Sequence, residues 1–454
     1  MSRALDLAEQ ALRAAEGDET EVLVHAERSG VARFAGSVVH QPTLIDNAVV
    51  RLRVARDGKV GWAATNRVDA GSLAEVARRA GEAADSAKPD PAFPGFAPPA
   101  ERPDVPTYDE ETAALAAEDQ ARLAATAIEA AGDYELYGYF TSGVTEIALA
   151  CATGLRAQQA LTDAVCICLA AVEGASGWAE QTSWRAADVD PAVPAHEAAE
   201  TAARTRGAGE LEPGTYRSVL GPYAVAELLR WFSYDSLGAH GYLEERSYFC
   251  GRIGERAFDP KVSIADDALD GRNLPKAFDF EGTPKQRVEL VEDGVIRGVV
   301  WDRLSAARAA NGQVSTGHAP PDAWRFYGPL PVALTMAAGE VGSTDELTAL
   351  VGDGIFVTRL HYLSVVDPRE GILTGTTRDG TFRVRDGKLA EPLVNLRFTV
   401  SMADVLREVP GISRELKLVN LNDLYDERFA YAALVPALAT ARFHITGTGA
   451  GPGL

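Results

Sequence analysis

Apolar and polar residues alternate along the first part of the chain in a pattern that predicts helices and strands in turn. Apolar side chains recur at helical spacing near the start of the chain, which is typical of an amphipathic helix. Two runs of strict alternation and an Asp-Gly pair follow; this pair tolerates the positive φ of a tight hairpin turn. The pattern predicts a helix at 2–16, strands at 21–26 and 48–55, a turn at Asp57-Gly58 with a returning strand at 60–64, and a helix at 71–87.

A second series of elements with a similar order begins after residues 88–107, which contain seven prolines. Proline neither donates to a strand ladder nor continues a helix, so this segment is predicted to be an extended crossover or linker. The second series is predicted to hold a helix at 109–131, strands near 135–150, 154–161, 164–172 and 178–185, and a helix at 192–206.

The rest of the chain has mainly β patterning. A strand at 216–220 precedes a helix, and two hairpins are predicted around Asp293-Gly294 and Asp386-Gly387. The sequence therefore predicts an α+β protein, in which a two-part α+β N-terminal region precedes a β-rich C-terminal domain. The predicted boundaries are 1–87 for the first unit, 88–107 for the linker, 108–210 for the second unit and 211–454 for the C-terminal domain.

The charge of the chain argues against some classes of partner. Its 454 residues include 65 acidic and 44 basic side chains, for a net charge of −21. Such a surface repels phosphate backbones and anionic lipid, so neither nucleic acid nor a membrane is an expected partner. No apolar run approaches the ~20 residues of a membrane span, and the N-terminus carries acids where a signal peptide needs an apolar core. We expect a cytoplasmic protein.

The cysteines are too few for a disulfide scaffold. The chain has four, Cys151, Cys166, Cys168 and Cys250, whereas small disulfide-stabilised folds are much denser in cysteine. Cys166 and Cys168 lie two residues apart in an apolar run, where they would share one face of a strand. All four fit a reducing compartment.

Five stretches of the chain, most of them glycine turns, lie at 57–66, 84–91, 278–306, 354–360 and 375–392. In order and spacing they resemble the TldD/PmbA family of two-subunit metallopeptidases. Each motif is weak alone, but together they extend over most of the chain. The departures are a His361-Tyr362-Leu363-Ser364 run in place of small residues and Arg378-Asp379 within a glycine-rich turn.

The resemblance implies a metal site that this chain lacks. Catalytic subunits of the family hold zinc with HExxxH on a helix, where two imidazoles bind the metal and the glutamate activates water. The corresponding helix here, near 223–237, contains no histidine. We therefore expect no catalytic residue and no metal in this subunit, with zinc in its partner. The degenerate helix carries Leu228, Leu229, Arg230, Trp231, Ser233 and Asp235.

Two other clusters offer weak alternative metal ligands. His196, Glu197 and Glu200 read HExxE within the predicted helix at 192–206. The simpler interpretation of that run is a polar helix face. The second cluster is His240 and Glu244 with Cys250 beyond, which follows the degenerate helix; such a cluster is more often a solvated connector.

The resemblance implies a TldE/PmbA-type, non-catalytic subunit. Its expected partner is a TldD-like zinc subunit that cleaves unfolded or leader peptides, while this chain closes the chamber and limits access. Extended peptides would dock by strand addition. In isolation the chain would form a homodimer. Two alternatives remain, namely a divergent metallopeptidase active on its own and a self-associating peptide-binding scaffold.

Overall fold

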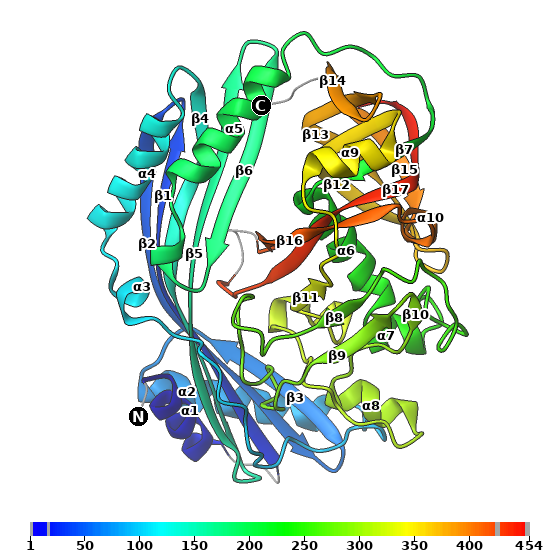
Figure 1. Ribbon diagram of the computed structural model, residues 1–454. Helices are drawn as coiled ribbons and strands as arrows, with labels where there is room; N and C mark the ends of the chain where they lie inside the picture. Colours follow the sequence, from blue (N-terminus) through cyan, green and yellow to red (C-terminus); the bar gives the residue numbers. More distant parts are fainter. Residues whose placement is uncertain (1–2, 16–18, 423–426, 450–454) are drawn as a thin grey trace.

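The computed structural model describes residues 3–15, 19–422 and 427–449. Two sheets dominate the structure, and they lie side by side (Figure 1). A long six-stranded sheet is formed by the first half of the chain. The second half forms a more branched sheet with helices and loops around it, so the α+β class with a β-rich C-terminal region is confirmed.

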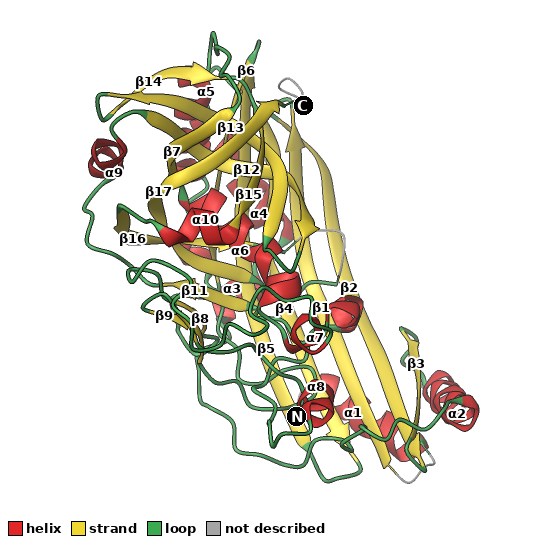
Figure 2. Ribbon diagram, turned by 90° about the vertical axis from the view of Figure 1, so that its right-hand side faces the viewer, coloured by secondary structure: helices red, strands yellow, loops and turns green. Residues whose placement is uncertain are grey.

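The long sheet joins the two predicted N-terminal units through their first strands. Its strand order is β3-β2-β1-β4-β5-β6. Strand β1 pairs antiparallel with β4, from Glu21 opposite Cys151 to Phe34 opposite Gly138. The strands are unusually long, as Figure 2 shows. They are β1 (Glu19–Ala35), β2 (Val38–Arg56), β3 (Lys59–Thr65), β4 (Glu135–Cys151), β5 (Arg156–Val172) and β6 (Ala175–Ser183).

Helices pack against this sheet at several places. Val22, Val24 and Leu52 project from the sheet into a core shared with α1 and α2. Helix α4 packs on β1, β2 and β4, and α5 packs on β5 and β6. These helices are α1 (Arg3–Ala14), α2 (Ala70–Ser86), α4 (Ala117–Ala130) and α5 (Ala192–Arg204), close to three of the four predicted ranges.

Two predicted elements differ from the structure. The helix expected over 109–131 is two helices, α3 (Glu110–Ala114) and α4, because the Asp119 carboxylate caps the backbone N–H of Ala116 and starts a new helix there. The strands expected at 154–161 and 164–172 are one continuous strand, β5. Residues 88–107 form neither a helix nor a strand, as the prolines predict.

The C-terminal region contains an eleven-stranded sheet, whose main path runs β10-β9-β8-β11-β17-β15-β13-β12-β7. Strand β14 pairs with β13, and β16 pairs with β17. Its strands are β7 (Gly214–Leu220), β8 (Ile264–Asp266), β9 (Val288–Glu292), β10 (Val295–Ile296), β11 (Ala333–Met336), β12 (Gly354–Asp367), β13 (Ile372–Arg385), β14 (Lys388–Leu393), β15 (Leu396–Ser401), β16 (Gly411–Asn420) and β17 (Ala432–Thr448). Its helices are α6 (Pro222–Ser236), α7 (Ala239–Leu243), α8 (Arg303–Ala309), α9 (Thr344–Val351) and α10 (Met402–Arg407), with a short 3₁₀ helix at Asp322–Tyr327. A second 3₁₀ helix, Ala186–Asp188, precedes α5 in the N-terminal region.

The predicted boundaries between the two N-terminal units, the linker and the C-terminal domain remain predictions. The two N-terminal units share one sheet, because β1 pairs with β4. Within the described ranges, none of the helices combines the length and apolar character needed to cross a membrane. Helix α6, which carries the residues expected at the degenerate metal site, packs on β12 and β17.

Candidate functional site on helix α6

Helix α6 begins directly after strand β7, at Gly221-Pro222. The N–H groups in the first turn of a helix have no partner within the helix, so proline, which has no N–H, fits there without loss. The N–H of Gly221 donates to the carbonyl of Val357 at 2.9 Å. A Cβ at Gly221 would lie 3.0 Å from the carbonyl oxygen of Thr358, so the turn has little space for a side chain. The start of the helix is thus fixed against β12.

Of the six residues named on the degenerate helix, three are buried and one, Arg230, lines a small cavity. Leu228, Leu229 and Ser233 are buried, and the Ser233 hydroxyl donates to the Arg230 carbonyl at 2.6 Å. Trp231 packs edge-on against Tyr234 at 5.5 Å between ring centroids. The remaining two predicted residues make ionic contacts. Arg230 pairs with Glu227 at 3.7 Å, and Asp235 pairs with Arg246.

The small cavity, of about 220 Å³, lies between α6, the long sheet and strands β12 and β16. Three of its lining side chains are guanidinium groups, those of Arg33, Arg230 and Arg359. One carboxylate, that of Glu227, lines it as well. Its full lining is Arg33, Tyr139, Ile167, Trp178, Tyr223, Glu227, Arg230, Arg359, Leu360, Val419, Asn420, Leu421 and Asn422.

The arginines of this cavity are held by aromatic rings and carboxylates. Arg359 lies 4.3 Å from the centroid of the Trp178 ring and 3.5 Å from an Asp379 oxygen. Arg230 donates to the Tyr234 hydroxyl at 2.9 Å. Burial lowers the pKa of Arg359, although Asp379 opposes the shift. The positive charges of these guanidinium groups repel a dication. The groups also provide no lone pair that could bind a metal.

A zinc ion therefore does not fit this helix. When Glu227 takes the glutamate's place in HExxxH, Ala226 and Trp231 take the places of the two histidines, and neither side chain is a ligand. Throughout the described ranges, no three His, Cys, Asp or Glu side chains come together in a group able to hold a metal ion.

The first alternative cluster is dispersed over α5. His196 and Glu200 are exposed, whereas Glu197 turns inward. The Tyr223 hydroxyl donates to Glu197 Oε1 at 3.1 Å, and the Lys417 ammonium lies 2.8 Å from Glu197 Oε2. Glu197 thus joins α5 to α6 and β16.

The second alternative cluster also makes local contacts. His240 Nε2 lies 3.5 Å from Glu244 Oε1, and the Cys250 thiol donates to the Tyr242 carbonyl at 3.3 Å. His240 and Glu244 face a second, larger cavity.

One buried carboxyl near α6 has no counterpart among the predicted residues. Glu180 on β6 is 1% exposed, and burial raises its pKa to about 8. The Asn420 N–H donates to Glu180 Oε1 at 2.6 Å, and the Glu180 N–H donates to the Tyr223 hydroxyl at 3.1 Å. Glu180 and Arg359 contact residues far away in sequence, so no local motif signals them.

The structure is thus an α+β protein whose helix α6 offers no set of metal ligands. Residues 213–447 match the PmbA/TldA metallopeptidase C-terminal domain, and residues 20–84 match PmbA/TldA metallopeptidase domain 1. The C-terminal match covers more than half of this chain, so the chain belongs to the PmbA/TldD family.

Individual relatives agree with this assignment. A metalloprotease TldD homolog from Haemophilus influenzae is 26% identical over 178 residues, 38% of this chain and 36% of that protein. A metalloprotease from Methanothermobacter thermautotrophicus is 27% identical over 201 residues, 42% of each chain. The chain thus matches less than half the length of these curated relatives.

Solved structures resemble the chain over nearly its whole length. TldE from Thermococcus kodakarensis superimposes with a TM-score of 0.86 at 17% identity, covering 97% of this chain and 99% of that one. A putative modulator of a DNA gyrase from Thermotoga maritima gives a TM-score of 0.83 at 18% identity, with the same coverage. At these identities the likeness establishes the fold alone.

Proposed function

We propose that this chain is the non-catalytic, TldE-like subunit of a two-subunit metallopeptidase. In this proposal a TldD-like homologue carries the zinc and cleaves unfolded or leader peptides. The present chain completes the chamber, limits access to extended substrates, and acts in the cytoplasm.

The lining of the α6 cavity is the observation that carries the proposal. A zinc peptidase needs neutral imidazoles or carboxylates around its metal and a general base next to the bound water. The cavity instead has three arginines, and its one carboxylate pairs with Arg230. Arg359 is also held by Trp178 and Asp379. Activity would therefore have to come from another subunit.

The long sheet supports the docking of an extended segment. Strand β3 pairs with β2 only from Val50 to Arg56. Residues 38–49 of β2 pair with β1 on one side, and among the described residues no strand pairs with their other side. An unpaired edge accepts an added strand through main-chain hydrogen bonds, which tolerate many side chains. A peptide or a partner strand could use this edge.

The test is co-expression with a zinc-bearing homologue that has HExxxH. We expect the two chains to co-purify, zinc to be found only in the homologue, and peptide cleavage to require both chains. Loss of cleavage after substitution of the homologue's zinc ligands is the matched control. Cleavage by this chain alone, with stoichiometric metal, would favour a divergent peptidase. Failure to associate with the homologue, combined with self-association and peptide binding, would favour a scaffold.

A further inference from the structure

A second cavity, of about 690 Å³, lies between the long sheet and the C-terminal region. Strands β1, β2 and β3 form one wall, and the proline-rich segment forms another with residues 88–97. Residues of helices α7 and α8 close the remaining side. A volume of this size is typical of cavities that hold small ligands.

The floor of this cavity holds two carboxylates around one guanidinium group. Arg53 donates to Glu21 Oε1 from Nε at 2.8 Å and from Nη2 at 2.6 Å. Glu281 Oε1 lies 3.6 Å from Arg53 Nη1, which is longer than a hydrogen bond. Glu281 Oε2 accepts from the Arg303 N–H at 3.1 Å. The Glu281 side chain is 13% exposed.

The lining arginines already have negative or polar partners. Arg51 pairs with Asp322 at 3.3 Å and also with Glu427. Arg308 pairs with Asp90 at 3.1 Å. The Arg303 guanidinium donates to the carbonyls of residues 94–96 at 3.4–3.5 Å. On the carboxylate side, Glu281 Oε1 lies 3.6 Å from Arg53 Nη1, and the buried Glu21 Oε2 has no hydrogen-bond partner. A ligand cation would therefore lie at these carboxylates, next to Glu281.

Apolar side chains surround this acidic floor. Phe96 is 4% exposed and Phe280 is 6% exposed, and Phe93 packs edge-on against Phe96 at 5.2 Å. Leu23 and Trp62 add to the wall from the sheet. A ligand with an ammonium group next to an apolar side chain would match both parts of the cavity.

We infer that this cavity binds the free N-terminal ammonium group of an extended peptide with an apolar first residue, and that the Glu281 carboxylate accepts from that ammonium. This binding goes beyond the proposed function, because the chain alone is sufficient for it. The apolar side chain would lie against Phe93, Phe96 and Phe280. The rest of the peptide would leave past Trp62, which is 56% exposed.

The protonation of Glu281 gives this binding a pH dependence. Burial raises the pKa of Glu281 to about 7, although Arg53 opposes the shift. Below that value the carboxyl is neutral and is a poorer partner for a cation. Above about 8 the peptide's own amino group loses its charge, so affinity should peak between the two. The charged or titratable groups facing Glu281 are Arg53, Glu21, Asp279, Asp302 and Arg303.

The test is calorimetric titration of the full chain, without any partner, with a pentapeptide amide that begins with leucine. The matched ligand is the same peptide with an acetylated N-terminus. We expect acetylation to weaken binding by about tenfold or more, the loss of one charge-assisted hydrogen bond. Equal affinity for the two peptides, or no binding of the free peptide at millimolar concentration, would overturn the inference. Because no partner is present, this result is independent of whether the peptidase complex forms.

A substitution identifies the acceptor. Glu281→Gln keeps an oxygen for the Arg303 N–H but removes the charge, so it should weaken the free peptide about tenfold and leave the acetylated peptide unaffected. Glu118→Gln, at an exposed position of α4 outside the lining of the cavity, is the control and should change neither affinity. Thermal melting checks the folding of both variants. If Glu281→Gln does not fold, the acetylation and pH comparisons on the wild-type chain still decide the inference.

Discussion

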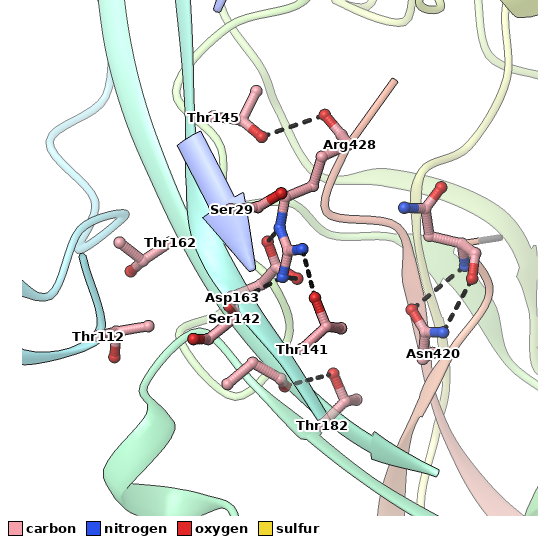
Figure 3. A network of polar contacts seen from close by, with 12 residues as sticks. Ser29, Thr112, Thr141, Ser142, Thr145, Thr162, Asp163, Thr182, Asn420 and Arg428 are labelled. Carbon is pink, nitrogen blue, oxygen red and sulfur yellow. Dashed lines mark hydrogen bonds and ion pairs between the residues drawn. The ribbon is translucent and has the colours of Figure 1, made fainter. Parts of the chain in front are cut away.

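Arg428 and Asp163, 265 residues apart in sequence, form a bidentate ion pair between the C-terminal region and the long sheet (Figure 3). Arg428 Nε lies 2.8 Å from Asp163 Oδ1, and Nη2 lies 2.6 Å from Oδ2. Both side chains are less than a tenth exposed. The remaining Arg428 nitrogen, Nη1, donates to the Thr141 hydroxyl at 2.9 Å, so the guanidinium group is well satisfied.

The main chain of Arg428 continues the same network. Its carbonyl accepts from the Thr145 hydroxyl at 3.1 Å and contacts His25 Nε2 at 2.9 Å. Its N–H donates to Glu27 Oε2 at 3.1 Å. Strands β1, β4 and β5 therefore all contact this one residue, which holds the C-terminal region on the sheet.

Asp163→Asn should destabilise the protein strongly. The substitution leaves the Arg428 charge buried without its counter-ion, a loss that typically costs about 3 kcal/mol or more. The measurement is the midpoint of urea unfolding followed by tryptophan fluorescence. As a control, Glu75→Gln breaks a pair with Arg78 in which both side chains are more than half exposed. That change should have little effect on stability, because water screens an exposed pair. Similar small losses in both variants would mean that Asp163 does not hold the two parts together.

Glu180→Gln should make stability less dependent on pH. The folded-state pKa of Glu180 is raised from 4.5 to about 8, so the folded protein keeps a proton that the unfolded chain releases. The stability associated with this proton is complete below pH 4.5, declines as pH rises, and is lost above about pH 8. Each unit of difference between the two pKa values corresponds to about 1.4 kcal/mol.

The measurement for this position is the thermal midpoint of wild-type and variant proteins at pH 5, 7 and 9. The variant should gain stability relative to the wild type as pH increases, because it has no carboxylate to ionise. A difference that stays constant from pH 5 to 9 would contradict the raised pKa. Glu118→Gln, at an exposed position of α4, is a suitable control and should show no such trend.

The order of residues along the chain predicted the Asp-Gly hairpin turns. It predicted none of the contacts between residues far apart in sequence. The predicted turns have the positive φ that the sequence implied, for example 51° at Asp57 and 74° at Gly58. Such turns depend on the conformational preferences of two residues. The β1–β4 pairing and the Arg428–Asp163 contact join residues more than a hundred positions apart, and no local periodicity specifies them. Arg230 was already among the predicted residues of α6. The cavity residues Arg33 and Arg359 were not predicted, since Arg359 depends on Trp178 in the distant strand β6.

Gly61 shows why one residue of the 57–66 motif must be small. A Cβ at this position would lie 2.0 Å from the Ala84 nitrogen and 2.4 Å from the Ala80 carbonyl oxygen, because β3 packs directly on α2. Gly61→Ala should therefore destabilise the protein by about 1–3 kcal/mol or more, measured by thermal unfolding. Gly298→Ala is the matched control, since a Cβ there meets nothing within 4 Å. A neutral Gly61→Ala variant would show that α2 can move away from β3.

Zinc should not stabilise the isolated chain. A ligand that binds the folded state with a concentration 100 times its Kd stabilises it by about 2.7 kcal/mol, which is readily seen as a rise in the melting temperature. The α6 helix provides no imidazole, and Arg33, Arg230 and Arg359 around its cavity repel a dication. We therefore expect the same melting temperature with 100 µM zinc and with a chelator. The zinc-bearing homologue, treated identically, should melt lower once its metal is removed. A clear zinc-dependent rise in this chain that His196→Ala or His240→Ala abolishes would instead locate a metal site at one of the two alternative clusters.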